Sequence, residues 1–207
     1  VAEYARQCPY ILEYVIVDDG SSDDTFDTIV NYSKHSDMTI KVLQLFVPCG
    51  QFHALMAGFD IADGDYVVTL DDDLEYQPRE IDKLIEAINS ETGKVDVVIG
   101  LPATDNRGVI RNLGSRLKNK VNNLLVSRLE NVKSGSFRLL TKEYAYKLRE
   151  YDVANPIMGP LIFQSTHRVS NVIVTRSKSI RRSNYSLLKL LGIFLGSIQS
   201  FSEILFR

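Results

Sequence analysis

Short apolar runs alternate with amphipathic stretches through the first half of the sequence, and this alternation limits the fold more than any other feature. Runs rich in β-branched residues predict strands at 14–17, 40–45, 66–70 and 95–99. Capping residues and apolar spacing predict helices after 21–25, at 51–62 and at 78–89. Strands and helices in this alternation predict an α/β fold, Rossmann-like, whose mostly parallel sheet is flanked by helices.

The second half of the sequence carries less regular signals. They predict a helix at 107–128, an extended segment at 132–140, a helix at 142–149 and a strand at 172–174. After Asn155-Pro156 the composition becomes apolar and then, from 176 to 182, basic, so we divide the chain into 1–150 and 151–207. One apolar stripe predicts a C-terminal amphipathic helix at 187–205, which either packs on the sheet or lies on a membrane surface.

Charge and cysteine content exclude several classes of protein. The 24 basic and 26 acidic residues leave a formal net charge of -2, so no general basic field exists for nucleic acid. Cys8 and Cys49 lack the spacing of a metal site or a disulfide framework, which fits a reducing compartment. The beginning of the chain has no basic and apolar signal peptide, so we do not expect secretion. The apolar stretch 187–198 is shorter than the ~20 residues of a membrane-spanning helix.

Three consecutive carboxylates, Asp71-Asp72-Asp73, follow the predicted strand at 66–70. In an extended turn alternate side chains face the same way, so Asp71 and Asp73 can converge on one ion while Asp72 points elsewhere. A hard divalent cation, Mg²⁺ or Mn²⁺, prefers such oxygen ligands and neutralises a departing diphosphate. The alternative is a solvated acidic turn before the helix at 78–89.

A second acidic pair, Asp18-Asp19, follows the strand at 14–17. In parallel sheets ligands bind beyond the carboxyl ends of the strands, where carboxylates can accept hydrogen bonds from a base and a ribose. The alternative is helix capping, but Ser21, Ser22 and Asp23 already supply capping side chains. We therefore expect Asp18 and Asp19 to bind a nucleotide.

Several motifs in this order resemble the family 2 glycosyltransferases of GT-A fold, especially the polyprenyl-phosphate, dolichyl-phosphate-mannosyltransferase-like branch. The motifs are the segments 17–23, 50–58, 62–74, 134–139 and 183–185, with Pro78 and Glu80, and the resemblance covers nearly the whole chain. It implies a GT-A core at 1–150 that binds a nucleotide-sugar and an acceptor-side segment at 151–207. It also implies that Asp18 contacts a uracil or guanine base, with Asp19 nearby, and that Asp71 and catalytic Asp73 handle the metal and the diphosphate.

The acceptor side can be argued from charge. A lipid monophosphate is largely anionic near neutral pH, so it needs cations more than it needs a strong base. The candidates are the catalytic Arg138 and the basic residues Lys178, Arg181 and Arg182, because cationic side chains bind phosphate and guanidinium groups do so bidentately. The alternatives are a surface ion pair for Arg138 and a solvated loop for 178–182.

The predicted activity is inverting transfer of a sugar to a polyprenyl phosphate by a peripheral protein at the cytoplasmic face of the cell membrane; the sequence is compatible with a homo-oligomer. Alternatives are a saccharide acceptor, an inactive fragment, or a signalling receiver domain. Relatives begin with a further strand and often continue into membrane-spanning helices, whereas this chain opens inside the following helix. We therefore expect the strand at 14–17 to have an exposed edge. Relatives also differ at Pro48, Ser136 and Gly159.

Overall fold

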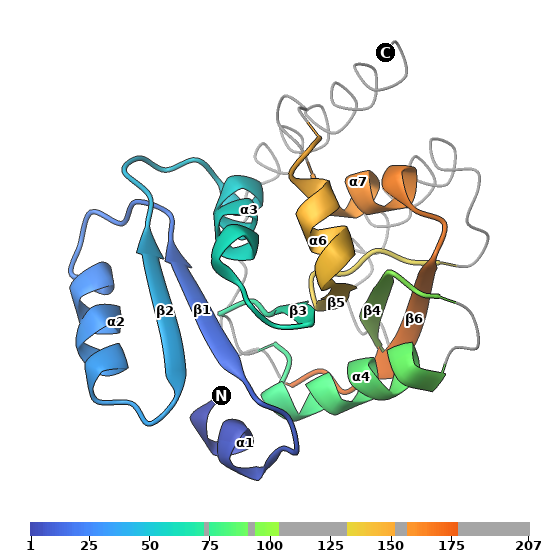
Figure 1. Cartoon of the computed structure of the whole chain (residues 1–207), viewed down its shortest axis with the longest axis horizontal. Helices are drawn as coiled ribbons and strands as arrows, with labels where there is room; N and C mark the ends of the chain where they lie inside the picture. Colours follow the sequence, from blue (N-terminus) through green and yellow to red (C-terminus); the bar gives the residue numbers. More distant parts are fainter. Residues whose placement is uncertain (73–74, 91–93, 104–131, 152–156, 178–207) are drawn as a thin grey trace, which may run out of the picture. The chain divides into compact units, whose positions relative to one another are not determined.

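A computed structural model of the 207-residue chain describes residues 1–72, 75–90, 94–103, 132–151 and 157–177 (Figure 1). The chain forms two compact units. The first unit comprises Val1–Thr69 and Leu140–Glu150, and the second comprises Leu70–Leu139 and Tyr151–Arg207. The division into 1–150 and 151–207 stays a prediction.

The first unit is built around two parallel strands. Its elements are α1 (Ala2–Gln7), β1 (Glu13–Asp18), α2 (Thr25–Lys34), β2 (Thr39–Gln44), α3 (Gln51–Ile61), β3 (Tyr66–Thr69) and α6 (Lys142–Leu148). The register of β1 and β2 runs from Glu13↔Thr39 to Asp18↔Gln44, so the carboxyl ends of both strands meet. In Figure 1, α2 lies beside β2 and α3 lies against β1. Gly58 permits this approach, since a Cβ there would lie 3.3 Å from Val17 Cγ2.

The second unit contains a strand, β4, whose first four residues are buried. Its elements are η1 (Pro78–Glu80), α4 (Ile81–Ser90), β4 (Val97–Pro102), α7 (Met158–Ser165) and β6 (Val169–Val174), and the boundary between the units falls inside β5 (Arg138–Thr141). The four-stranded sheet has the order β3-β5-β4-β6, and β4 and β6 are parallel from Val97↔Val169 to Pro102↔Val174. The helices and parallel strands confirm the predicted α/β fold.

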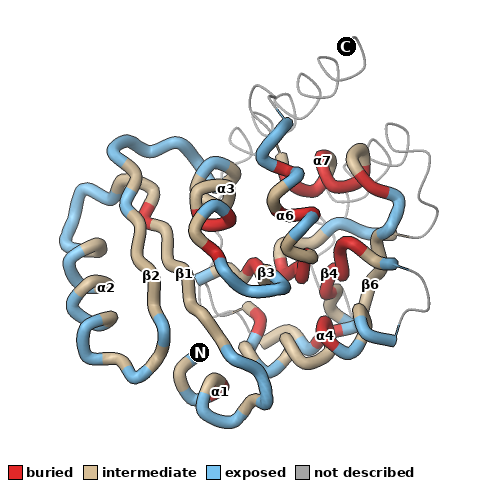
Figure 2. The backbone as a smooth tube through the Cα atoms, in the orientation of Figure 1, coloured by how far each residue is buried: buried red, intermediate tan, exposed pale blue. Residues whose placement is uncertain are grey.

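Burial differs between the two sheets (Figure 2). Val97, Val98 and Ile99 in β4 are 0% exposed, as expected of a parallel strand whose two faces are both covered. Each such side chain contributes on the order of 1.5–3 kcal/mol through burial. By contrast, β1 is only half-buried before Asp18, and β2 is its one partner among the described strands.

The predicted strands and helices of the first half are all present, with small shifts at their ends. The apolar stretch before Phe163 forms the helix α7, and the extended segment at 132–140 becomes a strand only at β5. The predicted helices at 107–128 and 187–205 lie outside the described residues. Within the described ranges, no helix combines the length and apolarity needed to cross a membrane.

Candidate functional site

The turn after β1 holds a buried carboxylate. Asp18 is 5% exposed and lies at the carboxyl end of the strand. Its Oδ1 accepts hydrogen bonds from the backbone N–H of Ser21 at 3.2 Å and from the Ser21 hydroxyl, while its Oδ2 accepts one from Gln44 Nε2 at 3.0 Å. The hydrogen bond from Ser21, followed by that from Gln44, outweighs the effect of burial and holds the pKa of Asp18 below its usual value. Asp18 is therefore an oriented anion near neutral pH.

The neighbouring carboxylate holds the loop that follows β2. Asp19 Oδ1 accepts a hydrogen bond from the backbone N–H of Cys49 at 2.7 Å, and Oδ2 accepts one from that of Gly50 at 2.8 Å. Gly20 has a φ of 70°, and a Cβ at this position would lie 2.9 Å from the backbone nitrogen of Pro48. The turn after β1 and the loop before α3 are thus locked together. Binding of a nucleotide by Asp19 remains a prediction.

Capping of α2 does not explain either carboxylate. The backbone N–H of Thr25, at the start of α2, is bound by Asp23 Oδ1 at 3.1 Å. Asp18 bonds to the turn and to β2, and Asp19 bonds to the loop before α3. The hydrogen bonds of Asp18 and Asp19 thus go to partners other than the first turn of α2.

The predicted metal ligands follow β3. Asp71 is half-buried and Asp72 is exposed in a turn, whereas Asp73 lies outside the described residues. No group of three or more His, Cys, Asp or Glu side chains within the described ranges is arranged to hold a metal ion. An oxygen ligand just beyond a strand end is nevertheless chemically suited to Mg²⁺ or Mn²⁺. Convergence of Asp71 and Asp73 on one ion stays a prediction.

The predicted phosphate-binding arginine is a buried residue. Arg138 opens β5, is 8% exposed and lies between Phe137 and Leu139, which are 1% and 0% exposed. The alternative of a surface ion pair is therefore wrong for Arg138. Lys178, Arg181 and Arg182 lie outside the described residues. Arg176, at the start of the same basic run, is paired through Nε with Glu75 Oε1 at 2.7 Å.

Asn171 holds the segment that leads to Arg138, and the sequence did not indicate this role. Its Oδ1 accepts a hydrogen bond from the Lys133 backbone N–H at 2.7 Å, and its Nδ2 donates to the Lys133 carbonyl at 3.0 Å. The segment continues to Phe137, whose ring stacks on Tyr76 with a centroid separation of 5.1 Å. The signal in the sequence was a polar residue, Asn171, within the strand β6. Its partner, Lys133, is far away along the chain, so the sequence did not reveal the contact.

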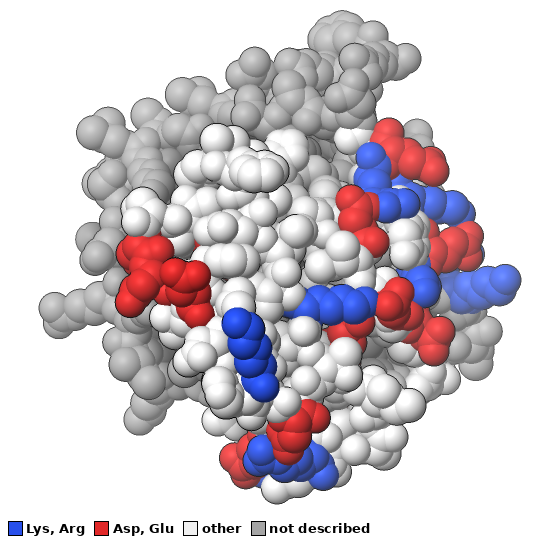
Figure 3. Space-filling view, turned by 60° about the vertical axis from the view of Figure 1, so that its left-hand side comes forward, with Lys and Arg blue, Asp and Glu red and all other residues white. Residues whose placement is uncertain are grey.

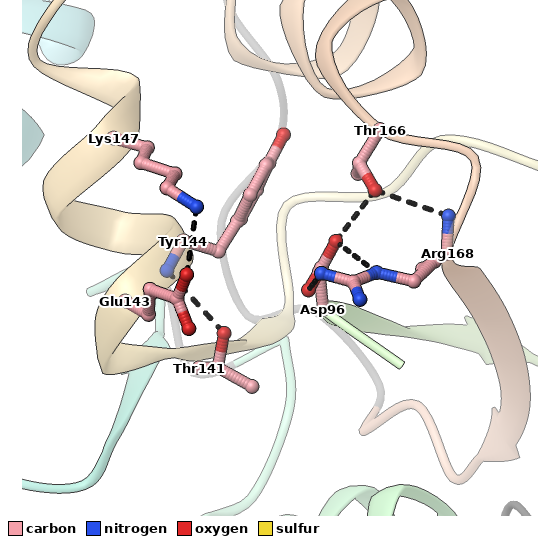
Figure 4. Close-up of polar contacts among 7 residues, drawn as sticks. All are labelled: Asp96, Thr141, Glu143, Tyr144, Lys147, Thr166 and Arg168. Carbon is pink, nitrogen blue, oxygen red and sulfur yellow. Dashed lines mark hydrogen bonds and ion pairs between the residues drawn. The ribbon is translucent and has the colours of Figure 1, made fainter. Parts of the chain in front are cut away.

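Two polar clusters near these elements have structural roles (Figure 4). In the second unit, the Asp96 carboxylate accepts hydrogen bonds from Thr166 Oγ1 at 2.6 Å and from Arg168 Nε at 2.9 Å. In the first unit, Thr141 Oγ1 accepts a hydrogen bond from the Tyr144 N–H at the start of α6. These contacts join elements within each unit.

The charged side chains on the face drawn in Figure 3 are interspersed in sign. In the first unit, Lys41 Nζ lies 2.6 Å from a carboxylate oxygen of Glu13 and 2.6 Å from one of Asp63. No continuous basic area appears among the described residues on this face.

Comparison with known proteins finds relatives that match most of the chain. The family described as glycosyl transferase family 2 matches residues 1–149. The chain is 28% identical over 192 residues to the undecaprenyl-phosphate 4-deoxy-4-formamido-L-arabinose transferase of Serratia proteamaculans (strain 568), covering 89% of this chain and 56% of the relative. The transferase of the same name from Yersinia pestis (strain Pestoides F) is 27% identical over 188 residues, covering 87% and 55%. The chain thus spans about half the length of these curated relatives.

Solved structures share the fold at low sequence identity. Glucosyl-3-phosphoglycerate synthase from Mycobacterium tuberculosis, in complex with Mn²⁺, uridine-diphosphate-glucose and phosphoglyceric acid, superposes with a TM-score of 0.64 at 18% identity, covering 91% of this chain and 68% of that one. Mannosyl-3-phosphoglycerate synthase from Rubrobacter xylanophilus gives a TM-score of 0.63 at 13% identity, covering 98% and 66%. These likenesses confirm the glycosyltransferase fold predicted from the motifs.

Proposed function

This chain belongs to glycosyl transferase family 2, and we propose that it moves a sugar from a nucleotide-sugar to a polyprenyl phosphate with inversion at the anomeric carbon. The observation that carries the proposal is the similarity over 87–89% of the chain to transferases named for undecaprenyl phosphate. The oriented carboxylate of Asp18 at a strand end supports a nucleotide donor. Family membership also removes the receiver-domain alternative.

In the proposed reaction, Asp18 holds the nucleoside, and Asp71 with Asp73 would hold a Mg²⁺ or Mn²⁺ ion. When bound, that ion supplies neutralising charge for the departing diphosphate. A phosphate oxygen of the acceptor forms a bond to the anomeric carbon while the carbon–oxygen bond to the diphosphate breaks, and the nucleoside diphosphate leaves with the electron pair. The acceptor is already anionic near neutral pH, so this route needs no strong base.

The acceptor phosphate would be held by Arg138, with Lys178, Arg181 and Arg182. Burial of Arg138 supports this role, because a guanidinium with little water around it pairs more strongly with a phosphate. The proposal places the protein at the cytoplasmic face of the membrane, where a lipid-linked acceptor is reached. A saccharide acceptor is the alternative, and it would use the same donor side.

The test is transfer from a panel of labelled nucleotide-sugars to undecaprenyl phosphate in lipid vesicles, with Mg²⁺, Mn²⁺ or a chelator. A soluble saccharide serves as the competing acceptor. We expect a labelled lipid product that requires a divalent ion and is lost in Asp73→Asn. The matched control is Asp72→Asn. Asp72 is exposed and adjacent to Asp73 in the sequence, so this variant removes the same charge at a neighbouring position.

Two results would overturn the proposal. One is lipid-linked product formed equally well in the chelator or by Asp73→Asn, which would remove the metal-dependent mechanism. The other is labelled product on the saccharide alone, which would establish the alternative acceptor.

A further inference from the structure

Two segments that are remote in sequence are joined in the second unit. Tyr76 and Arg176 form an antiparallel bridge, and the Ser177 N–H donates a hydrogen bond to the Glu75 carbonyl at 2.8 Å. The side chains of Glu75 and Arg176 add an ion pair, with 2.7 Å between Oε1 and Nε. The segment 175–177 is therefore fixed against the segment that leads into η1.

Glu80, at the end of η1, holds the same segment from a second side. Its Oε2 accepts hydrogen bonds from the backbone N–H of Thr175 and from Lys83 Nζ, both at 2.7 Å. Lys83 Nζ also lies 3.4 Å from Thr175 Oγ1. The Glu80 side chain is only 14% exposed, and a hydrogen bond to a charged acceptor is stronger than one between neutral groups. Glu80 therefore anchors the main chain just beyond β6.

Both joined segments are close in sequence to predicted ligands. The segment 75–76 comes shortly after the acidic cluster 71–73, which the proposed function assigns to the metal and the diphosphate. The segment 175–177 comes immediately before the basic run 178–182, which the proposed function assigns to the acceptor phosphate. The junction thus lies between the donor side and the acceptor side of the chain.

The same junction contacts the segment that carries Arg138. The Tyr76 ring stacks on Phe137, the residue before Arg138, with a centroid separation of 5.1 Å. Phe137 is 1% exposed, and its carbonyl accepts a hydrogen bond from the Gly100 N–H at 2.9 Å. Phe137 therefore has little freedom to move, and it gives the junction a fixed support in the core.

Sugar transfer depends on the distance between the two phosphate-binding sides. The attacking oxygen and the anomeric carbon must approach to about 3–3.5 Å, and a misplacement of about 1 Å can cost a hundredfold in rate. Ligands on separate segments of the chain keep this distance only if the segments are fastened to one another. The contacts of Glu80 and Tyr76 supply such a fastening.

We propose that Glu80 is a positioning residue for the acceptor phosphate: by binding the Thr175 N–H, it fixes the segment from which the basic run 178–182 continues. This role of Glu80 rests on the proposed function, which assigns the basic run to the acceptor. The reach of the side chain to the main chain matters more than its charge, because the Thr175 N–H needs an acceptor oxygen at that point.

Three substitutions separate reach from charge. Glu80→Ala removes the acceptor oxygen, Glu80→Asp keeps the charge on a side chain that is one methylene shorter, and Glu80→Gln keeps an oxygen at the same reach without the charge. The assay is transfer to undecaprenyl phosphate in lipid vesicles with Mn²⁺, at varied acceptor concentration, from the nucleotide-sugar that the unaltered chain uses. We expect kcat/KM for the acceptor to fall about ten- to a hundredfold in Glu80→Ala and Glu80→Asp, chiefly through a higher KM, and to stay near its original value in Glu80→Gln.

Two further measurements locate the effect. Calorimetric affinity for the nucleoside diphosphate of that donor, with Mn²⁺, should be unchanged in all three variants. Amide hydrogen exchange at 175–177 should be faster in Glu80→Ala and Glu80→Asp but not in Glu80→Gln. The matched control is Glu86→Ala, which removes the same side chain from an exposed position of α4 and should leave the acceptor KM and the exchange unchanged.

Several results would overturn this role of Glu80. An unchanged acceptor KM with a lower kcat in Glu80→Ala and Glu80→Asp would mean only a loss of folded protein, and Glu80→Asp decides the question if Glu80→Ala does not fold. An equal rise of KM in Glu80→Gln would make charge, rather than reach, the cause. Either result leaves the proposed function in place as long as the unaltered chain forms a lipid-linked product. No such product from the unaltered chain refutes both the proposed function and the role of Glu80.

Discussion

Replacement of Asp96 by alanine is expected to destabilise the second unit by about 2–3 kcal/mol. The side chain connects the start of β4 to the segment before β6. Asp96 is 8% exposed, and its carboxylate is bound by Thr166 Oγ1 at 2.6 Å and by Arg168 through Nε at 2.9 Å and Nη2 at 2.6 Å. Removal leaves the buried Thr166 hydroxyl without its acceptor, which costs about 1–3 kcal/mol.

The loss of the ion pair between Asp96 and Arg168 destabilises the unit less than the loss of a fully buried ion pair would. The side chain of Arg168 is 50% exposed, so water replaces part of the lost interaction. The total therefore lies below the roughly 3–5 kcal/mol that follows when a fully buried pair is broken. Thr166→Val in combination with Asp96→Ala should show non-additive losses, because both variants remove the same hydrogen bond.

Hydrogen exchange of backbone amides in β4 and β6 is the suitable assay, because the chain forms two compact units and a global signal would mix them. The control is Glu143→Ala, which removes an exposed carboxylate 2.7 Å from Lys147 in α6 and should cost no more than about 0.5 kcal/mol. Unchanged protection of β4 and β6 in Asp96→Ala would refute this account of the cluster.

Three further predictions concern two closely packed glycines and the buried carboxylate. Gly100→Ala should destabilise β4 by about 1–3 kcal/mol in urea unfolding, since the added Cβ would lie 2.7 Å from Phe137 Cδ1. Gly20→Ala should cost about 1–3 kcal/mol and weaken nucleotide binding in calorimetry, because it strains a positive φ and crowds Pro48. The lowered pKa of Asp18 stabilises the fold at pH values above the pKa that this carboxyl has in the unfolded chain, and the contribution is lost as the pH falls through the folded pKa. Urea midpoints measured from pH 6 to pH 3 should therefore fall more steeply for the unaltered protein than for Asp18→Asn; parallel curves would contradict the assignment.

The alternation of elements could be predicted because it depends on local chemistry. The apolar runs of β1, β2 and β3 and the helical spacing of α3 are readable over a few neighbouring residues. Helix α7 was missed because it is apolar on nearly every side and contains Gly159 and Pro160, so it shows no helical stripe. Its burial became visible only when its packing partners were known.

Strand order and the partners of the polar residues could not be predicted. The order β3-β5-β4-β6 brings together strands that are remote in sequence. Asn171 was overlooked because it bonds the backbone of Lys133, which lies far away along the chain. The buried position of Arg138 was likewise hidden, since an arginine in a short apolar strand is equally compatible with a surface pair.

The acidic pair at the carboxyl end of β1 shows what the sequence could predict and what required the tertiary structure. By itself the sequence placed Asp18 and Asp19 beyond a strand end and predicted a nucleotide site, because strand propensity and turn chemistry are local. Only the tertiary structure decided that Asp19 binds the amides of Cys49 and Gly50 while Asp18 meets Gln44. Those partners are brought near by the register of two parallel strands, and register depends on how apolar faces pack rather than on any residue within the turn.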